Sequence, residues 1–194
     1  MKHATSRLLF SYWDALRGDR SAPDRSQIEP GQIRHILADT FILGVEPEGR
    51  AAFRLAGTRA CALFGRDLKG VDFSELWPSN RGSEADELID LVASDTVGAV
   101  AGMVGESDFG SVIGLELLLL PLRHHGATNR RMIGAISPSA VPTWLGLTAI
   151  QSLELRSLRV IGNSRPGRAG LGEVGPSANA KRHPFVVLNG GLSQ

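Results

Sequence analysis

Cysteine, long apolar runs and an excess of one charge sign are all scarce in this chain of 194 residues. The single cysteine excludes an intramolecular disulfide, so the chain is not a small disulfide-stapled scaffold. A formal net charge of +1 gives no overall attraction to nucleic acid or to an anionic membrane. Neither is therefore expected as a partner.

The apolar runs are also too short to span a membrane. The longest, Leu117–Leu122, is far below the roughly 20 residues that a spanning helix needs. Near the N-terminus, Tyr12, Trp13 and Asp14 interrupt the region where a signal peptide would be apolar. We therefore expect a soluble cytoplasmic protein with one domain.

Hydrophobic residues make up 42% of the chain, which is enough for a core. Near the N-terminus they recur at three- and four-residue spacing, which predicts an amphipathic helix ending near Gly18. Together with a polar connector this helix occupies residues 1–27. Its apolar residues are Leu8, Leu9, Tyr12, Trp13 and Leu16.

Further along the chain, strand-forming residues alternate with turn signals. Two strand candidates, Thr40–Val45 and Ala51–Leu55, precede short helical turns and a helix that begins at Ser83. Three more strand candidates follow: Ala99–Val104, Val112–Leu122 and Arg131–Ile136. This order predicts an α+β domain over residues 28–145, with a five-stranded antiparallel sheet and helices on one face.

Residues 146–194 are expected to form an extension. Leucines between residues 153 and 158 indicate one more extended or helical piece. After residue 162, glycine, proline, serine and asparagine dominate, and this composition predicts a largely flexible tail.

The strand candidate Val112–Leu122 is apolar on both of its faces, with Glu116 as the polar exception. A half-exposed antiparallel strand would alternate with polar residues, so both faces must be covered. We expect the helical middle of the domain to cover one face. The N-terminal helix, a partner subunit or both would cover the other.

A contiguous exposed apolar face usually marks a contact surface. The sequence therefore predicts a homodimer with the N-terminal helix at or beside the interface, although a helix folded back on its own sheet is an open alternative. The candidate interface residues are Leu8, Leu9, Tyr12, Trp13, Leu16, Leu118 and Leu120.

Five sequence blocks together resemble one known family. They are RLAGTRACALFGRDLKGVDFSELW (54–77), YWDALRG (12–18), IEPGQIRHILADTFIL (28–43), LLPLRHHG (119–126) and RMIGAISP (131–138). They are similar to the bacterial PAS-domain family PAS_5 over about residues 8 to 145. The resemblance implies a PAS-like fold, a sensory or regulatory role, and pairing of two copies through the N-terminal region.

The resemblance also implies a place for a ligand, between the helical middle and the inner sheet face. The candidate pocket residues are Phe53, Leu55, Cys61, Phe64, Leu117 and Leu119. No cofactor is expected. The block around Cys61 lacks the asparagine and glutamine of flavin-binding relatives, and the helix from Ser83 has no histidine to bind haem iron.

No catalytic or metal site is expected either, because the carboxylates are scattered and no two histidines have ligand spacing. Arg54, Arg59, Arg66 and Lys69 form a basic cluster that either stabilises turns or contacts an anionic ligand. We expect a non-enzymatic sensory protein that binds a small molecule, a separate signalling partner or both. The alternative is a ligand-free interaction domain.

Overall fold

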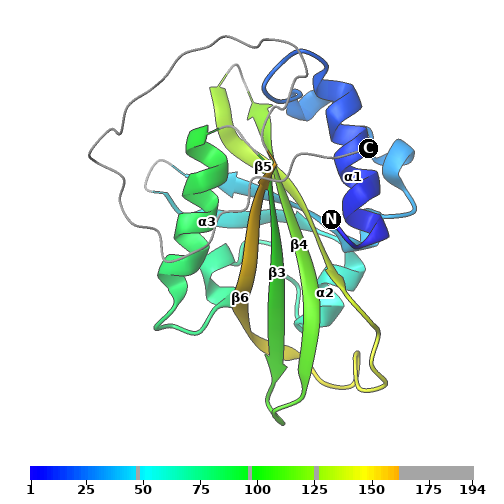
Figure 1. Ribbon diagram of the computed structural model, residues 1–194, viewed down its shortest axis with the longest axis vertical. Helices are drawn as coiled ribbons and strands as arrows, with labels where there is room; N and C mark the ends of the chain where they lie inside the picture. Colours follow the sequence, from blue (N-terminus) through cyan, green and yellow to red (C-terminus); the bar gives the residue numbers. More distant parts are fainter. Residues whose placement is uncertain (47–48, 96–97, 125–126, 162–194) are drawn as a thin grey trace, which may run out of the picture.

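The computed structural model describes residues 1–46, 49–95, 98–124 and 127–161. Within these ranges six strands form one antiparallel sheet in the order β2-β1-β5-β4-β3-β6 (Figure 1). The strands are β1 Thr40–Val45, β2 Ala51–Ala56, β3 Gly98–Ser107, β4 Val112–His124, β5 Ala127–Pro138 and β6 Ile150–Ile161. The predicted count of five was wrong, because β6 pairs along most of β3. The sheet thus continues beyond residue 145, and the predicted flexible tail lies outside the described residues.

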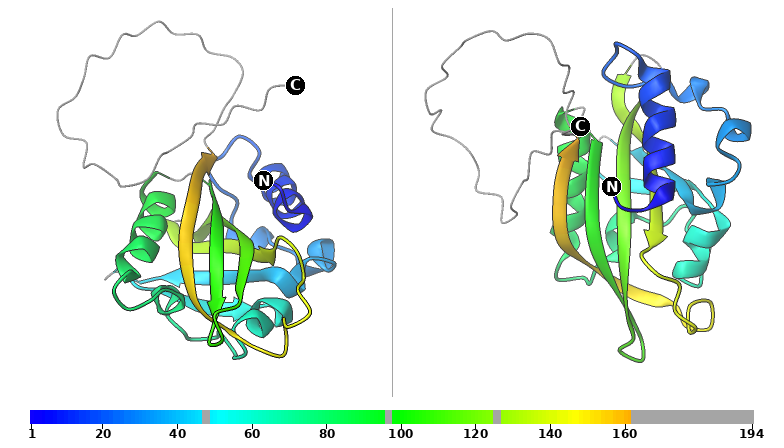
Figure 2. Two further views of the ribbon diagram at one scale, coloured as in Figure 1. Left: turned by 60° about the horizontal axis from the view of Figure 1, so that its bottom comes forward. Right: turned by 45° about the vertical axis from the view of Figure 1, so that its right-hand side comes forward.

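Helices lie on both faces of the sheet (Figure 2). They are α1 Ala4–Arg17, α2 Thr58–Leu63 and α3 Gly82–Asp95, with single 3-10 turns η1 Arg25–Gln27, η2 Pro30–Ile33, η3 Leu37–Asp39 and η4 Phe73–Leu76. The predicted α+β class and N-terminal helix are confirmed. Among the described residues, no helix is both long enough and apolar enough to cross a membrane.

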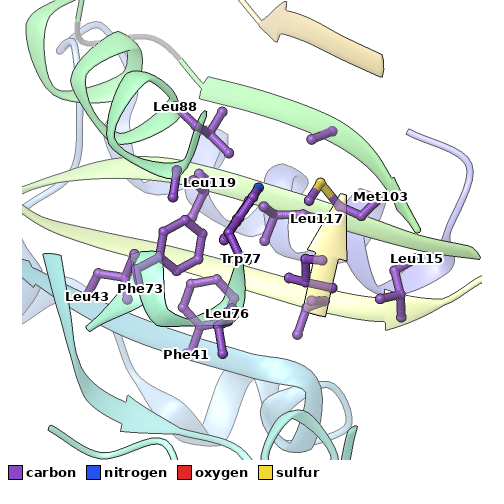
Figure 3. Close-up of a cluster of buried hydrophobic side chains, with 14 of the residues drawn as sticks. Phe41, Leu43, Phe73, Leu76, Trp77, Leu88, Met103, Leu115, Leu117 and Leu119 are labelled. Atoms are coloured by element: carbon purple, nitrogen blue, oxygen red, sulfur yellow. The ribbon is translucent and has the colours of Figure 1, made fainter. Parts of the chain in front are cut away.

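The inner face of the sheet carries the larger apolar layer, which we call the inner core. α2, α3 and η4 close it from outside, and aromatic rings fill its centre (Figure 3). The ring centroids of Phe53 and Phe73 are 5.9 Å apart, and those of Phe73 and Trp77 are 5.0 Å apart. Tilted ring pairs at these distances stabilise a packed interior beyond simple area burial.

A β-bulge in β2 changes which residues face the inner core. Leu43 pairs with Phe53, but the neighbouring Ile42 pairs with Leu55, so Arg54 is the extra residue. Such a residue reverses the alternation of side chains beyond it. Leu55 therefore shares the outer face with Ile42 and is 49% exposed, contrary to its predicted place in the inner core.

The outer face is covered by the chain's own N-terminal segment. Leu9 and Trp13 of α1 pack with Leu118, Leu120 and Leu122, and these three leucines are fully buried. The connector and the turns η1 to η3 extend this second layer, which we call the outer core. Of the alternatives that the sequence left open, the structure shows the helix folded back on its own sheet.

Trp77 should be among the most costly inner-core residues to truncate, because it is 3% exposed and packs on Phe73. We expect Trp77→Ala to lower the free energy of unfolding by about 3–5 kcal/mol in urea titrations. Leu147→Ala, at a site that is 86% exposed, serves as the control and should change little. Equal stability of the two variants would contradict this packing.

Candidate functional site

The predicted pocket residues are mostly part of the packed inner core. Phe53, Leu117 and Leu119 are each at most 1% exposed, and Phe64 is buried beside them. Cys61 lies half-buried at the edge of the same layer, with its Sγ 4.0 Å from the carbonyl oxygen of Ala56. Leu55 is on the other face. The structure thus brings five of the six residues together, four of them within the inner core and Cys61 at its edge.

A hollow of about 620 Å³ lies instead on the outer face of the sheet. Gly102 of β3 and Gly114 of β4 lie among its lining residues, and β6 and the segment Met1–His3 also line it. Gly102 and Gly114 leave room on this face of the sheet because they have no side chain. A Cβ built on Gly102 would lie 2.6 Å from the hydroxyl oxygen of Ser157. No sequence signal marked this place, since it depends on the pairing of β3 with both β4 and β6.

Three basic residues are among those that line the hollow, together with Glu116. Lys2, Arg156 and Arg159 line it, and Arg156 forms an ion pair of 2.9 Å with Glu154. Guanidinium and ammonium groups form their strongest hydrogen bonds with carboxylate and phosphate oxygens. The hollow is therefore suited to a ligand with an anionic group.

Glu116 joins the hollow to α1. Its carboxylate accepts hydrogen bonds from the backbone amides of Lys2 at 2.6 Å and His3 at 3.0 Å, immediately before the first turn of the helix. Burial raises the pKa of Glu116, but these hydrogen bonds outweigh it and hold the pKa below its usual value. The carboxylate is thus ionised near neutral pH and fixes the start of α1 to β4.

Other polar contacts hold α1 elsewhere along its length. The indole Nε1 of Trp13 donates to the carbonyl oxygen of Pro121 at 2.8 Å. Near the start of the helix, Thr5 Oγ1 lies 3.4 Å from a carboxylate oxygen of Asp39. Arg59 donates to both oxygens of that carboxylate, at 2.7 and 2.6 Å. Polar contacts therefore fix both the start of the helix and its last turns.

The predicted interface residues are largely internal. Leu9, Trp13, Leu118 and Leu120 are buried within one chain, and Tyr12 and Leu16 are half-buried. Leu8 is the exception at 46% exposed. Within one chain α1 covers the leucines of β4, which is the alternative of a helix folded back on its own sheet.

Comparison with known proteins identifies the family. The family model described as PAS_5, a PAS domain, matches residues 1–137. The chain belongs to the PAS_5 family of PAS domains. This confirms the resemblance seen in the sequence, and it makes the chain a domain of the sensory and signalling class.

The other comparisons add little to this PAS assignment. No curated protein sequence matches the chain. Among solved structures, the PAS domain of an HTR-like protein from Haloarcula marismortui is similar with a TM-score of 0.41 and 16% sequence identity. The alignment covers 56% of this chain and 89% of that one. A likeness of this degree has no bearing on function.

Sequence reasoning missed most of the polar contacts of this PAS domain. It singled out Glu116 as a lone charge in an apolar strand, but its partners lie more than a hundred positions away. The predicted basic cluster is dispersed: Arg59 bonds Asp39, while Arg66 lies 3.9 Å from Glu75. No three potential metal-ligating side chains come together within the part of the chain that the structure describes.

Replacing Glu116 by glutamine should weaken the hydrogen bonds that attach the start of α1 to β4. At pH 7 we expect the free energy of unfolding to fall by about 1–2 kcal/mol, since a neutral amide accepts hydrogen bonds more weakly. The folded pKa is below the unfolded one, so the carboxylate contributes fully above the unfolded pKa and loses this contribution as the pH falls through the folded pKa.

Urea titrations of wild type and Glu116→Gln at several pH values check this expectation. The two stabilities should converge as the pH falls from about 5 to about 3. Glu106→Gln changes an exposed carboxylate on β3 and is the matched control. A gap between wild type and Glu116→Gln that does not change with pH would contradict the assignment.

Proposed function

We propose that this PAS domain is a non-enzymatic sensory or regulatory module of bacterial signalling that acts in the cytoplasm and reports binding through α1. One observation supports this role. The segment Met1–His3 lines the outer hollow and leads directly into α1, and the backbone amides of Lys2 and His3 donate hydrogen bonds to Glu116. Whatever enters the hollow therefore contacts the chain where the helix is fixed to the sheet.

The proposed ligand is a small molecule with an anionic group. Small-molecule sites in proteins commonly measure about 300–1,000 Å³, and the hollow falls within that range. The basic residues Lys2 and Arg159, which line the hollow, would bind the anionic group. We assign neither flavin nor haem to the protein, for the sequence reasons given above.

The proposed output is a change in how α1 packs, passed to a separate signalling protein. α1 exposes Leu8 together with Arg7 and Ser11, where a partner can bind. In this proposal α1 has two packing positions in equilibrium. A ligand shifts that equilibrium only as far as it binds the two positions with different affinity. Contact with Met1–His3 would supply that difference.

A substitution that occupies the hollow should imitate a ligand. We expect Gly114→Trp to raise amide hydrogen exchange in the first turns of α1 by about tenfold, equivalent to about 1.4 kcal/mol. The tryptophan would press on Met1–His3, whereas exchange in β1 should stay unchanged. Hydrogen exchange followed by mass spectrometry measures both.

Val112→Trp is the matched control for this substitution. Val112 lies two residues earlier on the same face of β4, is 63% exposed and does not line the hollow. If Gly114→Trp and Val112→Trp affected α1 equally, the link between the hollow and the helix would be refuted.

A ligand-free interaction domain is the second candidate, and the densely packed inner core favours it. In that role the protein would be a homodimer that pairs through the exposed side of α1. We expect the full chain to sediment as a dimer at micromolar concentration and Leu8→Asp to weaken the dimer by about tenfold or more. Leu147→Asp, at an exposed site outside α1, should leave it intact. A monomeric wild type would contradict this candidate.

A further inference from the structure

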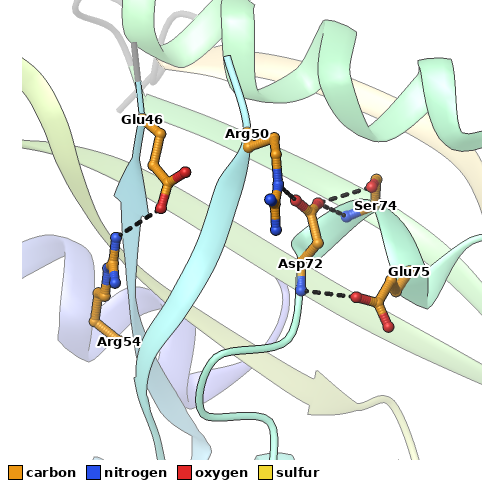
Figure 4. A network of polar contacts seen from close by, with 6 residues as sticks. All are labelled: Glu46, Arg50, Arg54, Asp72, Ser74 and Glu75. Atoms are coloured by element: carbon orange, nitrogen blue, oxygen red, sulfur yellow. Dashed lines mark hydrogen bonds and ion pairs between the residues drawn. The ribbon is translucent and has the colours of Figure 1, made fainter. Parts of the chain in front are cut away.

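The sheet has two edge strands, β2 and β6, and the chain closes the β2 edge itself. Backbone hydrogen bonds join β2 to the segment before η4. The N–H of Phe53 donates to the carbonyl oxygen of Val71 at 2.9 Å, and the N–H of Gly70 donates to the carbonyl oxygen of Phe53 at 2.8 Å. Nearby, the Arg50 side chain donates to the Asp72 carboxylate at 3.0 Å (Figure 4). The β2 edge thus has backbone and side-chain partners within the chain.

The β6 edge has no such cover in the part of the chain that the structure describes. β6 pairs with β3 on one side. Over residues 1–46, 49–95, 98–124 and 127–161, no backbone group bonds to its other side. In an antiparallel strand, alternate residues direct their N–H and C=O groups away from the paired neighbour. A row of such unpaired groups is a template for a further strand.

The last five residues of β6, Ser157–Ile161, are the part of this edge best suited to pairing. Earlier in the strand, Gln151 and Arg156 are the extra residues of two bulges, and bulges on an edge discourage an added strand. Ser157–Ile161 pairs with β3 without a shift. Leu158 belongs to the inner core, and Ile161 packs against the outer core. A strand added here would therefore have apolar neighbours on both of its faces.

The sequence after β6 contains one segment with the composition of such a strand. Phe185–Leu188 is a run of aromatic, β-branched and aliphatic residues between Pro184 and the turn signal Asn189-Gly190. It lies outside the described residues. The intervening residues 162–183 can reach about 70 Å when extended, whereas Ser157–Ile161 is only about 17 Å long. The segment is thus long enough and close enough in sequence to return to the β6 edge.

We propose that Phe185–Leu188 pairs with Ser157–Ile161 as a seventh strand and closes the open edge of the sheet. A strand of this sequence places apolar side chains on both faces, and the edge has apolar neighbours on both faces. The occupant is the chain's own segment, because closing a loop within one chain costs less than binding a strand from solution, and this cost grows slowly with loop length. In this position the segment keeps β6 from pairing with another molecule. The pairing does not depend on the roles proposed for the hollow and α1.

Amide hydrogen exchange in the full chain, measured for each residue by NMR, tests the proposal. We expect protected amides and the chemical shifts of a strand within Phe185–Leu188. We also expect slow exchange at those residues of Ser157–Ile161 whose N–H groups point away from β3. Exchange at Phe185–Leu188 as fast as in an unstructured peptide would overturn the proposal.

Proline substitutions test the pairing itself, because proline has no backbone N–H. Neighbouring strand residues direct their N–H groups to opposite sides, so either Val186→Pro or Val187→Pro removes a group that bonds to β6. We expect that variant to raise exchange at the outward N–H groups of Ser157–Ile161 by about tenfold or more. Val174→Pro changes a valine between β6 and the segment, is the matched control and should exchange like the wild type. If neither Val186→Pro nor Val187→Pro changed exchange in β6, the pairing would be refuted.

Protein concentration distinguishes the chain's own segment from that of a second copy. Pairing within one chain gives the same protection in dilute and concentrated samples, and this is the result we expect. Protection of Ser157–Ile161 that increases with protein concentration would show that a second copy supplies the strand, and it would overturn the assignment to the chain's own segment.

Discussion

The structure depends on one strand that has to be buried on both sides. β4 places Leu117 and Leu119 in the inner core and Leu118 and Leu120 in the outer core, and all four are at most 1% exposed. Burial of apolar surface contributes about 25 cal/mol per Å², so neither face can stay in water without a large loss of stability. The helical middle covers one face, and α1 has to cover the other. This helix is thus an integral part of the domain.

The helical middle and α1, which cover the two faces of β4, are held in place by different interactions. The inner core is closed by interlocking aromatic rings, which resist rearrangement because packed interiors have few alternative arrangements. α1 is held by its apolar stripe, by the hydrogen bond from Lys2, just before the helix, to Glu116, and by that from Trp13 to the carbonyl of Pro121; water can also satisfy these polar groups. Of the two covers, α1 is the one that can move at the lower energetic cost. The outer hollow adjoins the end of the helix where Glu116 holds it.

Sequence patterns predicted what depends on local periodicity. The two-faced character of β4 and the amphipathic α1 could both be seen in the spacing of leucines, and the PAS resemblance supplied the order of elements. The place of Leu55 could not be predicted, because a bulge at Arg54 reverses the alternation without a sequence signal. β6 was ambiguous, since a short apolar run suits a strand or a helix. The hollow depends on strand pairing across long separations, which periodicity does not report.

α1 covers the sheet of its own chain. Isotope-filtered NOE spectroscopy tests this arrangement in a sample that mixes equal amounts of ¹³C-labelled and unlabelled protein after joint refolding. We expect NOEs between the Trp13 indole and outer-core leucine methyls in the uniformly labelled protein. We expect none between labelled and unlabelled chains of the mixed sample. Intermolecular NOEs from Trp13 to those methyls would contradict it, because they would show that α1 lies on the sheet of a partner chain.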